Sequence, residues 1–100
     1  MTEFDVRVEL LGTRALATGA SAGIGAAVAR ALASNGATVW VNHPDEATLE
    51  AAEAVVTGIV EAGGTAQAIQ ADVSSEADVL AMFSALESKP LDILVNNAGI

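Results

Sequence analysis

The chain has 100 residues, 52 % of them apolar, which is enough for one domain with one core. Its 4 Lys and Arg against 13 Asp and Glu give a net charge of −9, so the chain has no basic face for nucleic acid or anionic membranes. The absence of cysteine excludes disulfides and thiolate metal sites. No apolar run approaches the ~18 residues of a membrane span and the acidic start is unlike a signal peptide, so we expect a cytoplasmic protein.

The first third of the chain predicts an extended segment, a strand and a helix. Apolar and charged residues alternate over 1–11, which is typical of an extended segment with one buried face. A short apolar run predicts a strand over 15–18, and residues 23–34 predict a helix that ends at Asn35-Gly36. We expect the buried face of this helix to carry four apolar residues: Ile24, Val28, Ala31 and Leu32.

The middle third predicts one strand and one helix. Residues 39–41 are rich in β-branched side chains and predict a strand, closed by a turn at Asn42-His43-Pro44. A helix is predicted from about Asp45 to Gly63-Gly64. Its apolar positions recur at intervals of three and four: Leu49, Ala52, Val56 and Ile59.

The last third repeats this order. A strand is predicted over 66–71, followed by a helix that Ser74 or Ser75 caps and that ends at Lys89-Pro90. The apolar stripe of that helix consists of Val79, Met82, Phe83 and Leu86. A fourth strand is predicted over 91–95, and we expect its residues 93–95 to be buried on both faces.

The resulting order, βαβαβαβ, predicts the fold class. Strands separated by helices of this length pair in parallel, and right-handed crossovers place the helices on the faces of the sheet. We therefore expect an α/β fold, one half of a doubly wound parallel sheet. Such a half leaves the fourth strand as an apolar edge, which favours a homo-oligomer or other association through that edge.

A glycine-rich loop, Thr18-Gly19-Ala20-Ser21-Ala22-Gly23-Ile24-Gly25, joins the first strand to the first helix. The first turn of a helix has unpaired N–H groups, and its dipole attracts anions, so a strongly acidic chain can still bind a pyrophosphate locally. We expect the amides from Thr18 to Gly25 to form this cradle, with Gly25 allowing the helix to lie close to the strand. The alternative is that the glycines only make a tight strand-to-helix turn.

Two further motifs accompany this T-G-x-x-x-G-x-G loop: Asp72-Val73 after the third strand and Asn96-Asn97-Ala98-Gly99 after the fourth. Together, in this order, they resemble the short-chain dehydrogenase/reductase family, and most closely its 3-oxoacyl-acyl-carrier-protein-reductase-like members. The resemblance implies a Rossmann-like domain of an NAD(P)-dependent oxidoreductase that transfers hydride between nicotinamide and a carbonyl or alcohol substrate. It also implies that residues 1–100 form one partial, N-terminal cofactor-binding domain, truncated after the fourth strand.

The resemblance assigns roles to individual residues. Asp72 would accept a hydrogen bond from the adenine amino group, with Val73 beside the ring. The less favoured alternative is that Asp72 only helps to cap the third helix. Asn96 would be structural. The phosphates and the adenosine ribose of the cofactor would contact Gly19, Ser21, Ala22, Gly23 and Ile24. The ribose on the nicotinamide side would contact Asn97, Ala98 and Gly99. For Ser21, an ordinary turn serine is the alternative.

The choice between NAD and NADP depends on the end of the second strand. The acid that binds the ribose of NAD is expected roughly 20 residues beyond the glycines, near His43, where no acid stands. Neither Ala22 nor Pro44 supplies the base that would pair with the 2′-phosphate of NADP, and Asp45 and Glu46 would repel it. His43 could donate to a phosphate or a hydroxyl, or it could be a solvent-exposed loop histidine. We expect NAD slightly in preference to NADP.

The catalytic residues of the family are missing from this sequence. The family uses a tyrosine and a lysine four residues later, but the chain has no tyrosine and its lysine, Lys89, precedes the last motif. We therefore assign no catalytic residue and no metal ligand, expect the chain alone to be inactive, and leave the substrate unassigned. The alternatives are a non-catalytic dinucleotide-binding module and a plain structural α/β unit.

Overall fold

The computed structural model describes residues 10, 12–86 and 91–97 of the chain. The extended segment predicted over 1–11 lies almost entirely outside these residues, as does the helix stop predicted at Lys89-Pro90. None of the helices that the structure describes has the length and apolar character required to cross a membrane.

Four strands form one sheet in the order β3-β2-β1-β4. All three pairings are parallel, which confirms the expected half of a doubly wound, Rossmann-like sheet. Because the strands are parallel, their carboxyl ends lie along the same edge of the sheet. The strands are β1 (Arg14–Ala17), β2 (Thr38–His43), β3 (Thr65–Gln70) and β4 (Ile93–Val95).

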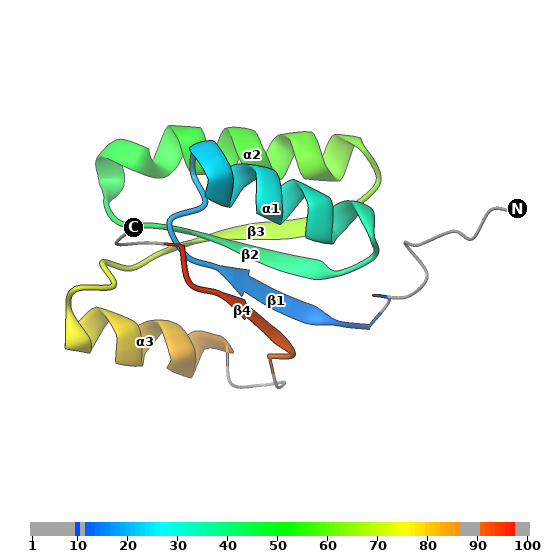
Figure 1. The fold of residues 1–100 in the computed structure, drawn as a ribbon. Coiled ribbons are helices and arrows are strands. Elements are labelled where there is room, and N and C mark those ends of the chain that lie inside the picture. Colours follow the sequence, from blue (N-terminus) through cyan, green and yellow to red (C-terminus); the bar gives the residue numbers. More distant parts are fainter. Residues whose placement is uncertain (1–9, 11, 87–90, 98–100) are drawn as a thin grey trace, which may run out of the picture.

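Helices cover both faces of this sheet (Figure 1). On one face lie α1 (Gly23–Ser34) and α2 (Leu49–Glu61), and on the other lies α3 (Glu76–Leu86). A short 3-10 turn, η2 (Glu46–Thr48), precedes α2, and Asp45 caps it through a capping box with Thr48. These short connections keep each helix against the strands that flank it in the sequence.

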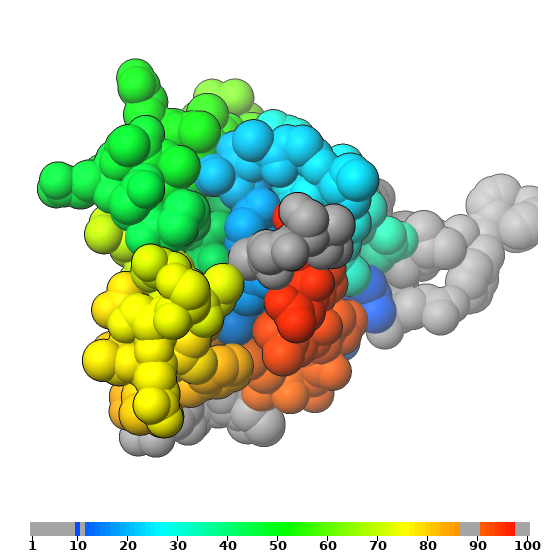
Figure 2. Space-filling model, turned by 60° about the vertical axis from the view of Figure 1, so that its left-hand side comes forward, coloured from blue at the N-terminus to red at the C-terminus, as the bar shows by residue number. Residues whose placement is uncertain are grey.

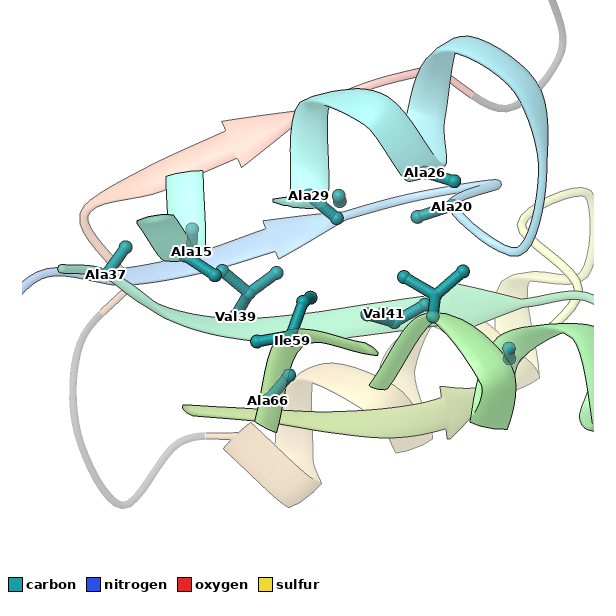
Figure 3. Packing of buried hydrophobic residues seen from close by; sticks show 13 residues of the cluster. Ala15, Ala20, Ala26, Ala29, Ala37, Val39, Val41, Ile59 and Ala66 are labelled. Atoms are coloured by element: carbon teal, nitrogen blue, oxygen red, sulfur yellow. The ribbon is translucent and has the colours of Figure 1, made fainter. Parts of the chain in front are cut away.

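The larger core consists mainly of alanine and valine (Figure 3). Ala26 and Ala29 of α1 lie over Ala15 and Ala20, so small side chains bring the helix close to the sheet. The predicted buried face of α1 is therefore only partly correct, since Leu32 packs against this core but Ile24 is 75 % exposed. The residues of α1 that are buried are Gly25, Ala26, Ala29 and Ala33.

The second core lies between the sheet and α3, around Leu16, Ala71, Met82 and Leu86. The stripe predicted for α3 is confirmed at Met82 and Leu86 only, because Phe83 remains 39 % exposed. In α2, Val55 rather than Val56 is fully buried.

The fourth strand differs from its prediction. Leu94 is 54 % exposed and β4 lies at the edge of the sheet, so this strand is not buried on both faces. Its outer side has no neighbouring strand among the described residues. Within this part of the chain β4 is therefore an edge strand that exposes Leu94, and association through this edge stays a prediction.

Candidate functional site

The residues singled out from the sequence lie at or just after the carboxyl ends of the four strands. Figure 2 shows blue-to-cyan, green, yellow and red segments of the chain meeting on one face of the molecule. The glycine loop follows β1, His43 ends β2, Asp72 follows β3 and Asn97 follows β4. The strand order reverses between β1 and β4, since β1 pairs with β2 on one side and with β4 on the other. In open α/β sheets, ligands bind beyond the carboxyl ends of the strands at such a reversal.

The glycine loop ends in an open helix terminus. Gly19 and Gly23 both have φ +62°, a left-handed conformation that glycine adopts without strain. Ala22, the N-cap residue of α1, has an extended backbone and supplies no side-chain cap. The first turn of α1 also carries no acidic residue, so nothing in this turn opposes an approaching anion.

Three amides of the predicted cradle are occupied by the protein itself. The N–H of Thr18 donates to the Val95 carbonyl at 3.0 Å. The N–H of Gly19 donates to Asn42 Oδ1 at 3.1 Å, and that of Ala20 to the Asn42 carbonyl at 2.9 Å. The prediction that the cradle begins at Thr18 is therefore wrong, because these N–H groups fix the loop to β2 and β4. The available donors belong to the later part of the loop and the first turn of α1.

That shorter cradle spans Ser21 to Gly25. The first N–H groups of an α-helix have no partner within the helix. A Cβ added at Gly23 would meet nothing within 4 Å, so the space next to this backbone is open. The Ser21 hydroxyl makes no hydrogen bond among the described residues, and it is half-buried beside the same turn. These groups fit a phosphate that approaches along the axis of α1.

Asn97 holds the loop from the side of β4. Its Nδ2 donates to the Gly19 carbonyl at 3.1 Å, and its N–H donates to Thr18 Oγ1 at 3.0 Å. Gly25 makes room for this contact, since a Cβ there would lie 2.6 Å from both Asn97 Nδ2 and the Gly19 oxygen. The structural role expected of Asn96 thus belongs to Asn97, while Asn96 is exposed.

The other two residues of the last motif, Ala98 and Gly99, lie outside the described residues.

Asn42 is the residue that sequence reasoning missed. It is 1 % exposed, and its Nδ2 donates to the carbonyls of Ile69 at 3.3 Å and Ala71 at 3.1 Å. Because its Oδ1 also accepts the Gly19 N–H, this side chain joins the ends of three strands, and the Asn42 main-chain carbonyl adds the bond from the Ala20 N–H. Asn42 was interpreted as part of a turn. The available signal was its two-residue spacing from Trp40, which places a polar side chain on a covered face of the sheet.

His43 belongs to β2, which extends two residues beyond its predicted end. The ring is 1 % exposed, so the alternative of a solvent-exposed loop histidine is wrong. Its Nδ1 lies 2.9 Å from the Asp45 carbonyl oxygen and 3.1 Å from Thr48 Oγ1. The capping structure at the start of α2 therefore fixes the orientation of the ring.

Asp72 is exposed and helps to order the start of α3. Its Oδ1 accepts the Ser74 hydroxyl at 2.6 Å and the Ser74 N–H at 2.9 Å. These two bonds, the side-chain bond first, lower the pKa of Asp72 below its usual value of 3.8. The cap of α3 itself is Ser75, whose hydroxyl accepts the N–H of Asp78 at 3.2 Å. Oδ2 of Asp72 makes no hydrogen bond within the described chain, and Val73 beside it is 37 % exposed.

The fold and the site together define a class of protein: α/β domains of Rossmann topology with a glycine-rich loop between β1 and α1. The family description "short chain dehydrogenase" matches residues 13–100. The chain belongs to the short-chain dehydrogenase/reductase family, as its motifs indicated.

Three curated relatives illustrate the similarity. The oxidoreductase YgfF of Escherichia coli is 51 % identical over 86 % of this chain and 35 % of its own length. A 3-oxoacyl-[acyl-carrier-protein] reductase of Synechocystis is 49 % identical over the same shares. The short-chain dehydrogenase/reductase homologue YusS of Bacillus subtilis is 45 % identical over 93 % of this chain and 85 % of its own length.

Solved structures give the same result. A 3-oxoacyl (acyl-carrier-protein) reductase of Agrobacterium tumefaciens with NADP bound has a TM-score of 0.81 at 39 % identity, over 91 % of this chain and 34 % of that one. A metagenomic short-chain oxidoreductase in complex with NADP has a TM-score of 0.82 at 41 % identity, over 90 % of this chain and 40 % of that one. The chain thus spans about a third of the length of YgfF and of the Synechocystis reductase.

Proposed function

We propose that this chain is the cofactor-binding N-terminal portion of an NAD(P)-dependent short-chain oxidoreductase. The observation that carries the proposal is the open N-terminus of α1 at the strand-order reversal, where the described residues provide neither a side-chain cap nor an acidic side chain. A dinucleotide pyrophosphate has the charge and size that this turn can bind. The structure therefore favours a binding site over a glycine loop that only makes a turn.

Different residues around this turn would bind different parts of the cofactor. The segment from Ser21 to Ile24 would bind the pyrophosphate, with the Ser21 hydroxyl as an additional donor. Oδ2 of Asp72 would accept a hydrogen bond from the adenine amino group, and Val73 would lie beside the adenine ring. Both predicted roles of Asp72 are compatible, since Ser74 bonds to Oδ1 only and leaves Oδ2 available to a ligand.

Asn97, Ala98 and Gly99 are proposed to follow the cofactor toward the nicotinamide. Gly19 would contribute by its conformation and by the absence of a side chain, because its N–H is already bonded to Asn42. The bound nicotinamide would supply or accept hydride, and this part of the chain would hold it in place.

NADP is the cofactor that we propose, because both solved relatives described above contain it. The slight preference for NAD rested in part on repulsion of a 2′-phosphate by Asp45. In the structure, the Asp45 carboxylate accepts the N–H of Thr48 at 3.0 Å and also lies 3.0 Å from the Thr48 hydroxyl. This carboxylate is thus held at the start of η2, although it keeps its negative charge, so the proposal of NADP rests on the solved relatives.

The hydride transfer itself would need residues that these 100 positions do not include, since the sequence contains no tyrosine. We propose that the chain by itself binds cofactor and does not catalyse, that its substrate is a carbonyl or alcohol compound, and that it acts in the cytoplasm. A non-catalytic dinucleotide-binding module is the second candidate. The chain covers 85 % of the short-chain dehydrogenase/reductase homologue YusS, which is thus a relative of similar length.

Binding of NADPH to the chain tests the proposal. At a concentration of about 100 times Kd, a ligand stabilises a protein by ~2.7 kcal/mol, which raises the Tm of a domain of this size by about 10 to 20 °C. Gly23→Ala should abolish this shift, because the methyl group would fill the open space next to the α1 amides.

Gly63→Ala is the matched control. Gly63 also has a positive φ, +95°, and open space around its Cβ position, but it lies at the opposite edge of the sheet, before β3. Both variants carry a similar backbone strain. Absence of any shift in the wild-type chain would contradict the proposal, and equal responses of the two variants would place binding away from α1.

A further inference from the structure

Among the four described strands, β4 is the one that the sheet holds most weakly. It has only three residues and, among these strands, a single neighbour, β1 (Figure 1). Ile93 and Val95 are half-buried against the larger core, and Leu94 is 54 % exposed. Elements with few buried apolar contacts open locally at a lower free energy than the rest of a fold. We therefore expect β4 to leave the sheet more readily than the other three strands.

The carboxyl end of β4 supports the glycine loop. The Val95 carbonyl accepts the N–H of Thr18 at 3.0 Å and the Thr18 hydroxyl at 3.2 Å. Just beyond the strand, the Asn97 N–H donates to Thr18 Oγ1, and Asn97 Nδ2 donates to the Gly19 carbonyl. These bonds break when β4 leaves β1. The conformation of the loop, and with it the direction of the free amides at the start of α1, therefore depends on the docking of β4.

The amino end of β4 is attached to β1 through Asp92. The Asp92 Oδ2 accepts the N–H of Arg14 at 2.9 Å, and the Asp92 N–H donates to the Arg14 carbonyl at 2.8 Å. Asp92 stands five residues before Asn97, which corresponds to roughly 16 Å in an extended chain. A phosphate bound at the start of α1 lies at the other end of β4, so Asp92 does not contact it. Any effect of this side chain on binding must pass through the strand.

Resting on the proposed function, we propose that Asp92 is a positioning residue of the cofactor site. Its carboxylate docks β4 onto β1, and the docked strand keeps Asn97 on the Gly19 carbonyl, so that the glycine loop has its binding conformation. The chain binds cofactor only while β4 is docked, and the apparent Kd equals the intrinsic Kd divided by the docked fraction. Because coupling between two equilibria is reciprocal, bound cofactor also holds β4 on the sheet.

Two substitutions at Asp92 test this coupling through the Kd of NADPH, measured by isothermal titration calorimetry. Asp92→Ala removes the acceptor of the Arg14 N–H, whereas Asp92→Asn keeps a carbonyl oxygen at that place. Loss of one hydrogen bond lowers an equilibrium constant about fivefold, so we expect Asp92→Ala to raise the Kd about two- to fivefold. Asp92→Asn should bind NADPH as tightly as the wild type does.

Gly63→Ala separates this effect from a general loss of stability. Gly63 also lies at the amino edge of the sheet, before β3, and its φ of +95° makes an alanine there strained. Two strands separate β3 from β4, so this substitution leaves the contacts of β4 in place. We expect Gly63→Ala to lower the Tm and to leave the Kd of NADPH unchanged at a temperature at which the variant is folded.

Hydrogen exchange of the wild type tests the reverse direction of the coupling. At an NADPH concentration of about 100 times Kd, an opening that abolishes binding becomes about 100-fold rarer. The Asp92 N–H should therefore exchange about 100-fold more slowly, although it lies at the end of β4 away from the cofactor. The control is the Gly63 N–H, which donates to the Val60 carbonyl at 3.0 Å at the end of α2 and should change little.

The outcomes separate this inference from the proposed function. If NADPH binds but Asp92→Ala leaves its Kd unchanged, or if Asp92→Asn or Gly63→Ala weakens binding as much, Asp92 does not position the site. Equal slowing of the Asp92 and Gly63 amides, or no slowing of either, also overturns the inference. In each of these cases the binding site at α1 stands. If NADPH does not bind to the wild type, the proposed function itself fails.

Discussion

Replacing Gly25 by alanine tests the packing of the glycine loop. A Cβ at this position would lie 2.6 Å from Asn97 Nδ2, 2.6 Å from the Gly19 oxygen and 3.0 Å from the Ala20 Cα. The Gly19 and Ala20 atoms are backbone and cannot move aside independently. Overpacking of this kind costs typically 1–3 kcal/mol, and loss of the bond from Asn97 to Gly19 costs about 1 kcal/mol more. The higher helix propensity of alanine returns about 1 kcal/mol. We therefore expect a net loss of about 2 kcal/mol.

Gly58→Ala provides the matched control in α2. An added Cβ at Gly58 meets nothing within 4 Å, so only the gain in helix propensity remains. We expect this variant to be about 0.5–1 kcal/mol more stable than the wild type. Urea unfolding followed by circular dichroism measures both changes. If Gly25→Ala were as stable as the wild type, the close contact between α1, the loop and Asn97 would be wrong.

Three further predictions concern other parts of the structure. Asn42→Ala should lower the free energy of unfolding by about 2–3 kcal/mol in urea, because the partners of this side chain are left unsatisfied in a covered position. Ser74→Ala should raise the pKa of Asp72, measured by carboxyl ¹³C NMR, because the hydrogen bonds that lower it are weakened. Because the pKa of Asp72 is lower in the folded than in the unfolded state, this carboxyl stabilises the wild type at pH values above its unfolded pKa. The free energies of unfolding of the wild type and Ser74→Ala should therefore differ near neutral pH and converge as the pH falls below 3.8. We also propose that β4 mediates self-association, so the wild type should elute earlier from size-exclusion columns as its concentration rises. Leu94→Lys should weaken this concentration dependence. Val60→Lys on α2 is the control and should leave it unchanged, because Val60 is about as exposed as Leu94. A monomer at all concentrations would contradict that proposal.

The order of strands and helices was predictable because each element has a local pattern. The β-branched run around Val39, the glycines after β1 and the serines before α3 act within a few residues of the chain. The end of β2 was not predictable in this way. Asn42 and His43 are polar, which is typical of a turn, yet they are buried because the loop after β1 and the start of α2 supply their partners.

In the candidate site, too, some features follow from the local sequence and others depend on residues far away in the chain. The position of the glycine loop follows from its spacing, but which of its amides remain available depends on Val95 and Asn42, which lie far away in the sequence. The buried face of α1 was partly mispredicted for a related reason. Large apolar residues such as Ile24 identify a helix face when the partner surface has room, whereas here alanines let α1 lie close to β1.

The most direct test of the binding site is a titration of the ¹⁵N-labelled chain with NADPH, followed through the backbone amide signals. The shorter cradle predicts the largest changes at Ser21 to Gly25. The amides of Gly19 and Ala20 should change less, because Asn42 already accepts their hydrogen bonds. Largest changes at Gly19 and Ala20, or changes confined to residues away from the start of α1, would contradict the site.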